Sequence, residues 1–199
     1  TNINKIIPIS ANNGINMDYL LKELSKFNYD RDFTKTTSSK LRMSVVRTFK
    51  TCLPGSKPHQ LTGGILGGSI IEGKAKIGQI VEIRPGKITN NNGIISVDPI
   101  YTTIMDLKSE NNTLEEAYPG GLIGMKTTLD PQYTMSNRLI GHIVGEPGTL
   151  PPVYSKIEIE FNPVNRYEHL LPSLKEFKKI ELVIHCLCME SKCKVTEIN

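Results

Sequence analysis

The chain has 199 residues and a formal net charge of +4, and 38% of its residues are hydrophobic. This length accommodates one large domain, or one domain with parts of its neighbours, and no apolar run approaches the ~20 residues needed to span a bilayer. Three of its four cysteines crowd near the C-terminus, which is unlike the framework of a small secreted fold, so we expect a cytoplasmic protein with no membrane partner.

The first segment predicts a strand followed by a helix. The strand is expected at Lys5–Ser10, and the helix at Asn16–Lys26, with Asn16 as its N-cap. Because one strand and one helix cannot bury both of their faces, we interpret them as the last unit of an α/β domain. Residues 28–40 are polar and are expected to form a linker.

Short β-rich segments then alternate with turn signals such as Pro85-Gly86 and Asn92-Gly93. Glycines recur from Leu61 to Gly86, where they indicate tight corners, bulges or the close approach of another chain. This spacing predicts a mainly β fold built on a closed antiparallel barrel. The expected strands are Leu41–Phe49, Gly68–Ile71, Gly78–Arg84, Gly93–Val97, Ile100–Leu107, Gly121–Met125 and Leu139–Val144.

Two further strands are expected after the proline-rich break at Glu146–Pro152. Tyr154–Phe161 alternates apolar and charged residues, which is typical of a half-buried strand, and Lys179–Met189 is a second apolar run. Two or three strands are too few to be stable alone. We therefore expect part of a second barrel here, and a chain that is cut at both ends.

The basic charge is concentrated in the glycine-rich region. Residues 41–100 carry eight Lys and Arg residues against three Asp and Glu residues. This surplus favours a surface that faces phosphates, while a solvated barrel exterior is the alternative. An RNA-binding β-barrel without a nucleotide switch is therefore one possible function.

Five strings occur in an order that resembles one family. They are PISAN at Pro8–Asn12, VVRTF at Val45–Phe49, GGILGGSIIEGKAKIGQIVEIRPG at Gly63–Gly86, YPGGLIGMKTTLDP at Tyr118–Pro131, and RLIGHIVGEPGTLP at Arg138–Pro151. Together they resemble the gamma subunits of translation initiation factor 2, which are translational GTPases. Their barrel is similar to the second domain of elongation factor Tu, and the selenocysteine-specific elongation factor is the nearest alternative. Asn162–Pro172 and His185–Ser191 depart from the pattern.

The resemblance implies four parts: residues 1–27 as the end of a GTP-binding domain, 28–40 as a linker, 41–150 as the domain II barrel, and 151–199 as the start of a domain III barrel. It implies a translation initiation factor, part of the GTP-dependent carrier of initiator methionyl-tRNA to the small ribosomal subunit. The implied partners are the alpha and beta subunits of the factor. The implied cofactors of the full-length protein are GTP and Mg²⁺, and its reaction is hydrolysis of GTP to GDP and phosphate.

Two nucleotide-binding motifs expected of a translational GTPase are missing from the sequence. The sequence holds no G-x-x-x-x-G-K-[ST] string to cradle phosphates and no Asn-Lys-x-Asp string to select guanine. We therefore expect no catalytic residue, no cofactor and no GTP hydrolysis in this piece alone. Ser10 and Ala11 resemble the last guanine-nucleotide motif, whereas a polar turn after a strand ordinarily serves only to connect it to a helix.

The same resemblance assigns two binding surfaces. Arg47, Gly63, Gly64, Gly120, Gly121 and Gly124 would line the pocket for the tRNA acceptor end, where glycines admit a ligand close to the backbone and Arg47 meets a phosphate. The alternative for Arg47 is an exterior position paired with Glu72 or Glu82. Lys50, Lys57 and Lys87, in the polar loops Lys50–Leu61 and Lys87–Asn92, are assigned to the alpha subunit, or else are ordinary surface-loop residues.

A cluster near the C-terminus contains ligand types that zinc prefers, His185, Cys186, Cys188 and Cys193. The spacing lacks the usual C-x2-C pair, however, and Cys186 and Cys188 would share one face of a single strand as packing residues. We therefore predict no metal site.

Overall fold

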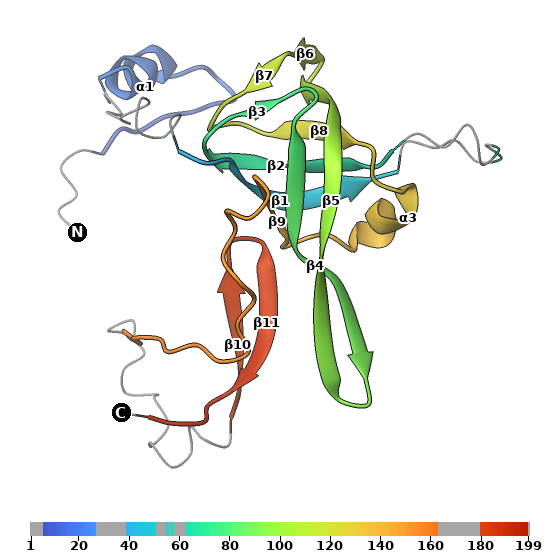
Figure 1. The fold of residues 1–199 in the computed structure, drawn as a ribbon. Helices are drawn as coiled ribbons and strands as arrows, with labels where there is room; N and C mark the ends of the chain where they lie inside the picture. The colour runs from blue at the N-terminus through green and yellow to red at the C-terminus, as the bar shows by residue number, and fades with distance from the viewer. Residues whose placement is uncertain are drawn as a thin grey trace. The chain divides into compact units, whose positions relative to one another are not determined.

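The computed structural model describes residues 6–26, 39–50, 55, 57, 63–162 and 180–198. It divides into two compact units, residues 1–33 and residues 34–199, which are drawn in Figure 1 and are described separately.

Among its described residues, 6–26, the first unit contains the helix α1 at Met17–Leu24. The expected strand at Lys5–Ser10 is wrong for its described part, because residues 6–9 lie outside any strand and Ser10 forms only an isolated bridge with Ile15. Asn16 is at the N-cap position as expected, but with φ 58° it makes no capping bond with its side chain, since its Nδ2 atom instead donates to the Pro8 carbonyl over 2.8 Å. The side chain thus closes the loop that precedes the helix.

The second unit contains the predicted barrel (Figure 1). Six strands form a closed ring in the order β4-β9-β1-β2-β8-β5, and pairing of β4 with β5 closes it. All the pairs are antiparallel. The expected mainly β fold built on a closed antiparallel barrel is therefore confirmed. The elements are β1 Arg42–Phe49, β2 Ile65–Glu72, β3 Ala75–Lys76, β4 Ile80–Asn91, β5 Ile94–Ser109, β6 Asn112–Leu114, β7 Glu116–Ala117, β8 Ile123–Thr127, α3 Pro131–Thr134, η2 Met135–Asn137 and β9 Ile143–Gly145.

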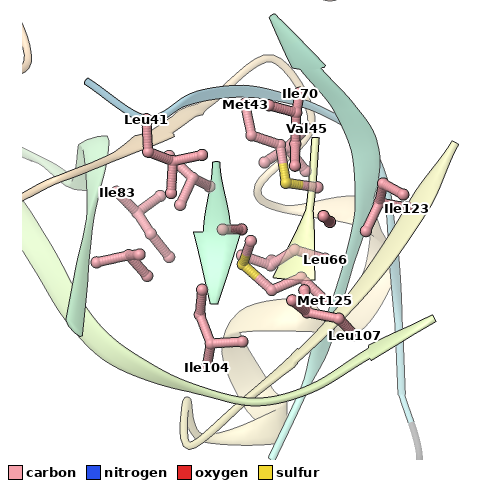
Figure 2. Packing of buried hydrophobic residues seen from close by; sticks show 14 of the residues in the cluster. Leu41, Met43, Val45, Leu66, Ile70, Ile83, Ile104, Leu107, Ile123 and Met125 are labelled. Atoms are coloured by element: carbon pink, nitrogen blue, oxygen red, sulfur yellow. The ribbon is translucent and has the colours of Figure 1, made fainter. Parts of the chain in front are cut away.

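Alternate residues of these strands fill the barrel interior. Leu66 and Ile70 on β2 point inward, and Figure 2 shows Leu66 beside Met125 of β8 and Leu107 of β5. Full burial of an aliphatic side chain of this size stabilises a fold by about 1.5–3 kcal/mol. The intervening residues of the same strands therefore face outward, where they are available for binding.

Strands β4 and β5 are longer than the sequence predicts. Neither Pro85-Gly86 nor Pro99 ends its strand, because a register shift between Ile83 and Lys87 takes up the extra residues as a bulge. The loop expected at Lys87–Asn92 is therefore wrong: residues 87–91 continue β4, and only Asn92 and Gly93 form the turn. Both turn residues have positive φ, 54° and 86°, as tight hairpins of the primed type require.

The expectations for the C-terminal segment also need correction. Tyr154–Phe161 forms no strand, because alternation produces a strand only where a neighbouring edge supplies backbone partners. Lys179–Met189 is not one strand but most of a hairpin, formed by β10 Glu181–Cys186 and β11 Met189–Lys194. Leu187 and Cys188 form its turn, so Cys186 and Cys188 do not share a strand as expected.

Candidate nucleic-acid interface

Two rows of outward-facing residues cross four neighbouring strands, β1, β2, β8 and β5. Each row follows the strand register from β1 to β5, and the two rows are two residues apart on every strand, so all eight residues share one face. At about 4.8 Å between strands, a row spans about 14 Å. One row is Arg47, Gly67, Gly124 and Lys108, and the other is Phe49, Ile65, Lys126 and Asp106.

The rows enclose a depression of about 250 Å³, which we call the barrel groove. Ile65, Asp106, Lys108, Gly124 and Lys126 line it. Arg47 and Phe49 lie beyond it on β1, in register with Gly67 and Ile65. The groove therefore combines an apolar wall, a floor without a side chain at Gly124, and charged groups along one side.

The charges of this face are mostly positive. Asp106 lies 4.0 Å from the Lys108 ammonium, while in the part of the chain that the structure describes neither Arg47 nor Lys126 forms an ion pair. The alternative partners of Arg47 are occupied: Glu72 lies 3.9 Å from Arg42, and buried Glu82 binds Arg84 and the Gly148 amide. The face thus presents three cations against one carboxylate.

A bulge in β1 sets the direction of Arg47. The register with β2 shifts between Val45 and Arg47, so Val46 is the extra residue. Val45 is buried before the shift, and Arg47 is exposed after it. Bulges commonly redirect a side chain in this way, and here the shift places Arg47 on the same face as the groove.

The predicted glycines divide into three groups. Gly124 lies in the groove, and a Cβ there would be 3.7 Å from the Lys108 carbonyl, an ordinary contact. Gly63 and Gly64 do not line it: a Cβ would lie 1.6 Å from the Thr127 carbonyl at Gly63 and 2.2 Å from the Thr134 side chain at Gly64. Those two glycines let the start of β2 pack closely against β8 and α3.

Gly120 and Gly121 form the turn that precedes β8, with φ 114° and 62°. The Ser69 hydroxyl donates to the Gly121 carbonyl over 2.8 Å. This turn lies at the opposite end of β8 from Lys126, and neither glycine lines the groove. Their positive φ values give them a conformational role in the turn.

The sequence did not indicate six residues of this face: Phe49, Ile65, Gly67, Asp106, Lys108 and Lys126. The i, i+2 spacing of Asp106 with Lys108, and of Gly124 with Lys126, indicates a shared strand face. That spacing does not reveal that β5 and β8 are neighbours. The groove therefore depends on strand pairing, which the local pattern does not contain.

A second charged cluster lies on the short β3–β7 sheet. The Glu116 carboxylate contacts the ammonium groups of Lys76 and Lys74, the latter at 3.5 Å, and accepts a 2.7 Å hydrogen bond from the Tyr118 hydroxyl. The hydrogen bonds from Lys76 and Tyr118 lower the pKa of Glu116 to about 2. Hydrogen bonding to Glu116 also raises the pKa of Lys76. These groups satisfy one another, so we interpret the cluster as a structural network.

The remaining predicted residues lie elsewhere. The Ser10 amide already donates to the Ile15 carbonyl over 3.2 Å, and the assignment of Ser10 and Ala11 to a nucleotide stays a prediction. Lys50 directly follows β1, and Lys57 is exposed in a segment that is mostly outside the described residues. Lys87 lies on β4 opposite Asp98.

Groups of metal ligands and membrane-spanning helices are both absent from the residues that the structure describes. Within them, no three His, Cys, Asp or Glu side chains come together as metal ligands could. No helix among them has the length and apolar character needed to cross a bilayer.

Comparison with known proteins identifies relatives by sequence. The chain is 44% identical over 163 residues to the translation initiation factor 2 subunit gamma of Pyrococcus furiosus, a match that covers 81% of this chain and 39% of the relative. It is 45% identical over 181 residues to that of Methanocaldococcus jannaschii, covering 88% of this chain and 41% of the relative. The chain thus spans about two fifths of these relatives. No family model matches the sequence.

Comparison of structures identifies the same fold. The apo crystal structure of translation elongation factor SelB from Methanococcus maripaludis superimposes with a TM-score of 0.54 and 21% identity, over 73% of this chain and 27% of that chain. The same factor in complex with the GTP analogue GPPNHP gives the same values. At this identity the likeness concerns the fold alone.

Proposed function

Because this chain belongs to the family of translation initiation factor 2 gamma subunits, we propose that its barrel is a binding platform for initiator methionyl-tRNA. The barrel groove would hold the single-stranded acceptor end of the tRNA. The observation that carries this proposal is the pair of rows across β1, β2, β8 and β5, which places three cations on the same face as the glycine floor of the groove.

The chemistry of the face suits a single-stranded RNA end. Arg47, Lys108 and Lys126 can neutralise backbone phosphates, and Arg47 and Lys126 have no competing ion pair among the described residues. Phe49 is 48% exposed and offers a ring on which an unpaired base can stack. Gly124 lets the ligand approach the backbone of β8 closely.

The β4–β5 hairpin supports a second contact, with the alpha subunit. Residues 88–97 contain no charged residue, so this arm is a poor surface for nucleic acid. Ile88, Val97 and Ile95 share one face of it, and Ile88 and Ile95 are 58% and 67% exposed. We place the alpha subunit on this face, with Lys50 and Lys57 as further contacts. Lys87 precedes Ile88 and belongs to the other face of the arm by register, so it would contact the subunit only at the edge of this surface.

GTP chemistry and the remaining partners are proposed for the full-length protein and not for this chain alone. We propose that it binds GTP with Mg²⁺, hydrolyses GTP, and joins a beta subunit and the small ribosomal subunit. GTP in the nucleotide domain would orient that domain against the barrel and complete the tRNA site, and hydrolysis would release the arrangement. Without a phosphate loop and an Asn-Lys-x-Asp string, the present chain would not bind GTP alone.

The direct test is a titration of the chain with initiator tRNA and with the same tRNA lacking its CCA end. The proposal requires weaker binding of the truncated tRNA, and further weakening in Arg47→Ala and Lys126→Ala variants. The alternative, an RNA-binding barrel without a nucleotide switch, predicts equal binding of both tRNAs through their helical regions.

A further inference from the structure

The barrel groove contains one group that a simple phosphate site does not need. The side chain of Asp106 lines the groove with Lys108 and Lys126, and it is 32% exposed. A carboxylate beside a bound phosphate is repulsive, so a purely anionic ligand would bind better without it. Its presence points to a ligand that also brings a hydrogen-bond donor.

Asp106 keeps its acceptor capacity. Its contact with the Lys108 ammonium, at 4.0 Å, is longer than a hydrogen bond. Within the described part of the chain, no hydrogen-bond donor reaches the Asp106 carboxylate. An ionised carboxylate has about four acceptor positions, and these are therefore open to a ligand in the groove.

The register fixes where such a donor must be. Asp106 is the direct partner of Lys126 across the β5–β8 pair, and such partners have Cα atoms about 4.5–5.5 Å apart. A ligand that places an anionic oxygen against Lys126 must therefore carry the donor for Asp106 close to that oxygen, no farther away than the width of one sugar. In a ribonucleotide, the 2′-hydroxyl stands on the sugar next to the phosphate and is a donor, whereas DNA lacks it.

We propose that Asp106 accepts a hydrogen bond from a ribose 2′-hydroxyl in the groove, and thereby selects an RNA end over a DNA end. This inference rests on the proposed function of the groove as the site for a single-stranded RNA end. Asp106 would act as a specificity-determining residue, while Lys108 and Lys126 provide most of the attraction.

The test uses the full chain and three synthetic RNA hairpins with a 3′ CCA overhang. The overhang sugars are ribose in the first, 2′-deoxyribose in the second, and 2′-fluororibose in the third, which keeps an RNA-like sugar shape without the donor. Fluorescence anisotropy gives the three dissociation constants for the unmodified chain, for Asp106→Asn, and for Asp98→Asn. Asp98 is an exposed aspartate on the same strand that does not line the groove, so it controls for the change of charge.

The unmodified chain and Asp98→Asn should bind the ribose overhang roughly three- to tenfold more tightly than the other two, as one exposed hydrogen bond allows. Asp106→Asn should bind all three about equally, and at least as tightly overall, because a repulsive charge is removed. Equal binding of the three hairpins by the unmodified chain, or a preference that survives Asp106→Asn, overturns the inference but not the groove. A fourth hairpin without the overhang that binds the unmodified chain as tightly as the ribose hairpin overturns both.

Discussion

Lys126 on β8 and Asp106 on β5 are direct partners in the strand register, yet they lie 20 residues apart in the sequence. The pairing places two groups in one groove: an ammonium that forms no ion pair with any described residue, and a carboxylate that accepts no hydrogen bond from one. Arg47 and Phe49, from a third part of the chain, extend the same face through β2. The proposed RNA site is therefore a product of barrel closure.

Removing Arg47 or Lys126 from the groove face should weaken tRNA binding in a salt-dependent way. Arg47→Ala and Lys126→Ala each remove one phosphate contact, so each should lower the slope of log K against log [salt] by about 0.7–0.9. Lys192→Ala, on the C-terminal hairpin, is the matched control and should leave the slope unchanged. Slopes equal to that of the unmodified chain in both variants would exclude these two residues from the interface.

Filling the groove floor should block binding without unfolding the barrel. A Cβ at Gly124 meets only ordinary contacts, at 3.7 and 3.9 Å, so Gly124→Val should fold and should bind the CCA end at least tenfold more weakly. A Cβ at Gly68, in contrast, would lie 1.9 Å from the Ser44 carbonyl. Gly68→Ala should therefore destabilise the barrel by about 1–3 kcal/mol, measured by urea unfolding. Unimpaired binding by a folded Gly124→Val protein would place the ligand elsewhere.

The charged network on β3 and β7 should make stability depend on pH. The pKa of Glu116 is about 2 in the folded chain, against an ordinary value of 4.5. A lowered pKa means that the ionised group stabilises the fold above pH 4.5, and that this contribution is lost as the pH falls from about 4.5 to 2. The melting temperature of Glu116→Gln should lie below that of the unmodified chain at pH 7, and the two should converge near pH 2. A constant difference across that range would contradict this assignment.

Charging one face of the β4–β5 hairpin should disrupt the alpha subunit contact alone. Ile88→Asp and Ile95→Asp place a carboxylate on the shared apolar face, and each should weaken alpha binding at least tenfold in a pull-down or calorimetric titration. Ile94 is 74% exposed but belongs to the other face by register, so Ile94→Asp is the control. tRNA binding should be unchanged in all three. Equal losses from Ile94→Asp would show that the face has been assigned wrongly.

The barrel can be predicted well from the sequence, because the patterns that indicate strands and turns involve residues that are close together in the chain. Alternation and turn residues such as Asn92-Gly93 identify the strands, and the strings from Val45 to Pro151 identify the family. Longer-range features are less accessible: the bulge between Ile83 and Lys87 turns an expected loop into a strand, and Tyr154–Phe161 alternates but forms no strand. Of the predicted tRNA residues, Gly124 lies in the groove and Arg47 lies on the same face, whereas Gly63 and Gly64 serve close packing. Those differences depend on which strands are neighbours.

The most direct test of the account is the affinity of the chain for initiator tRNA with and without its CCA end, measured at one salt concentration. Binding should be at least tenfold weaker once the CCA end is removed, and most of that difference should be lost in a folded Gly124→Val variant. Equal affinity for the two tRNAs would contradict the assignment of the barrel groove to the acceptor end.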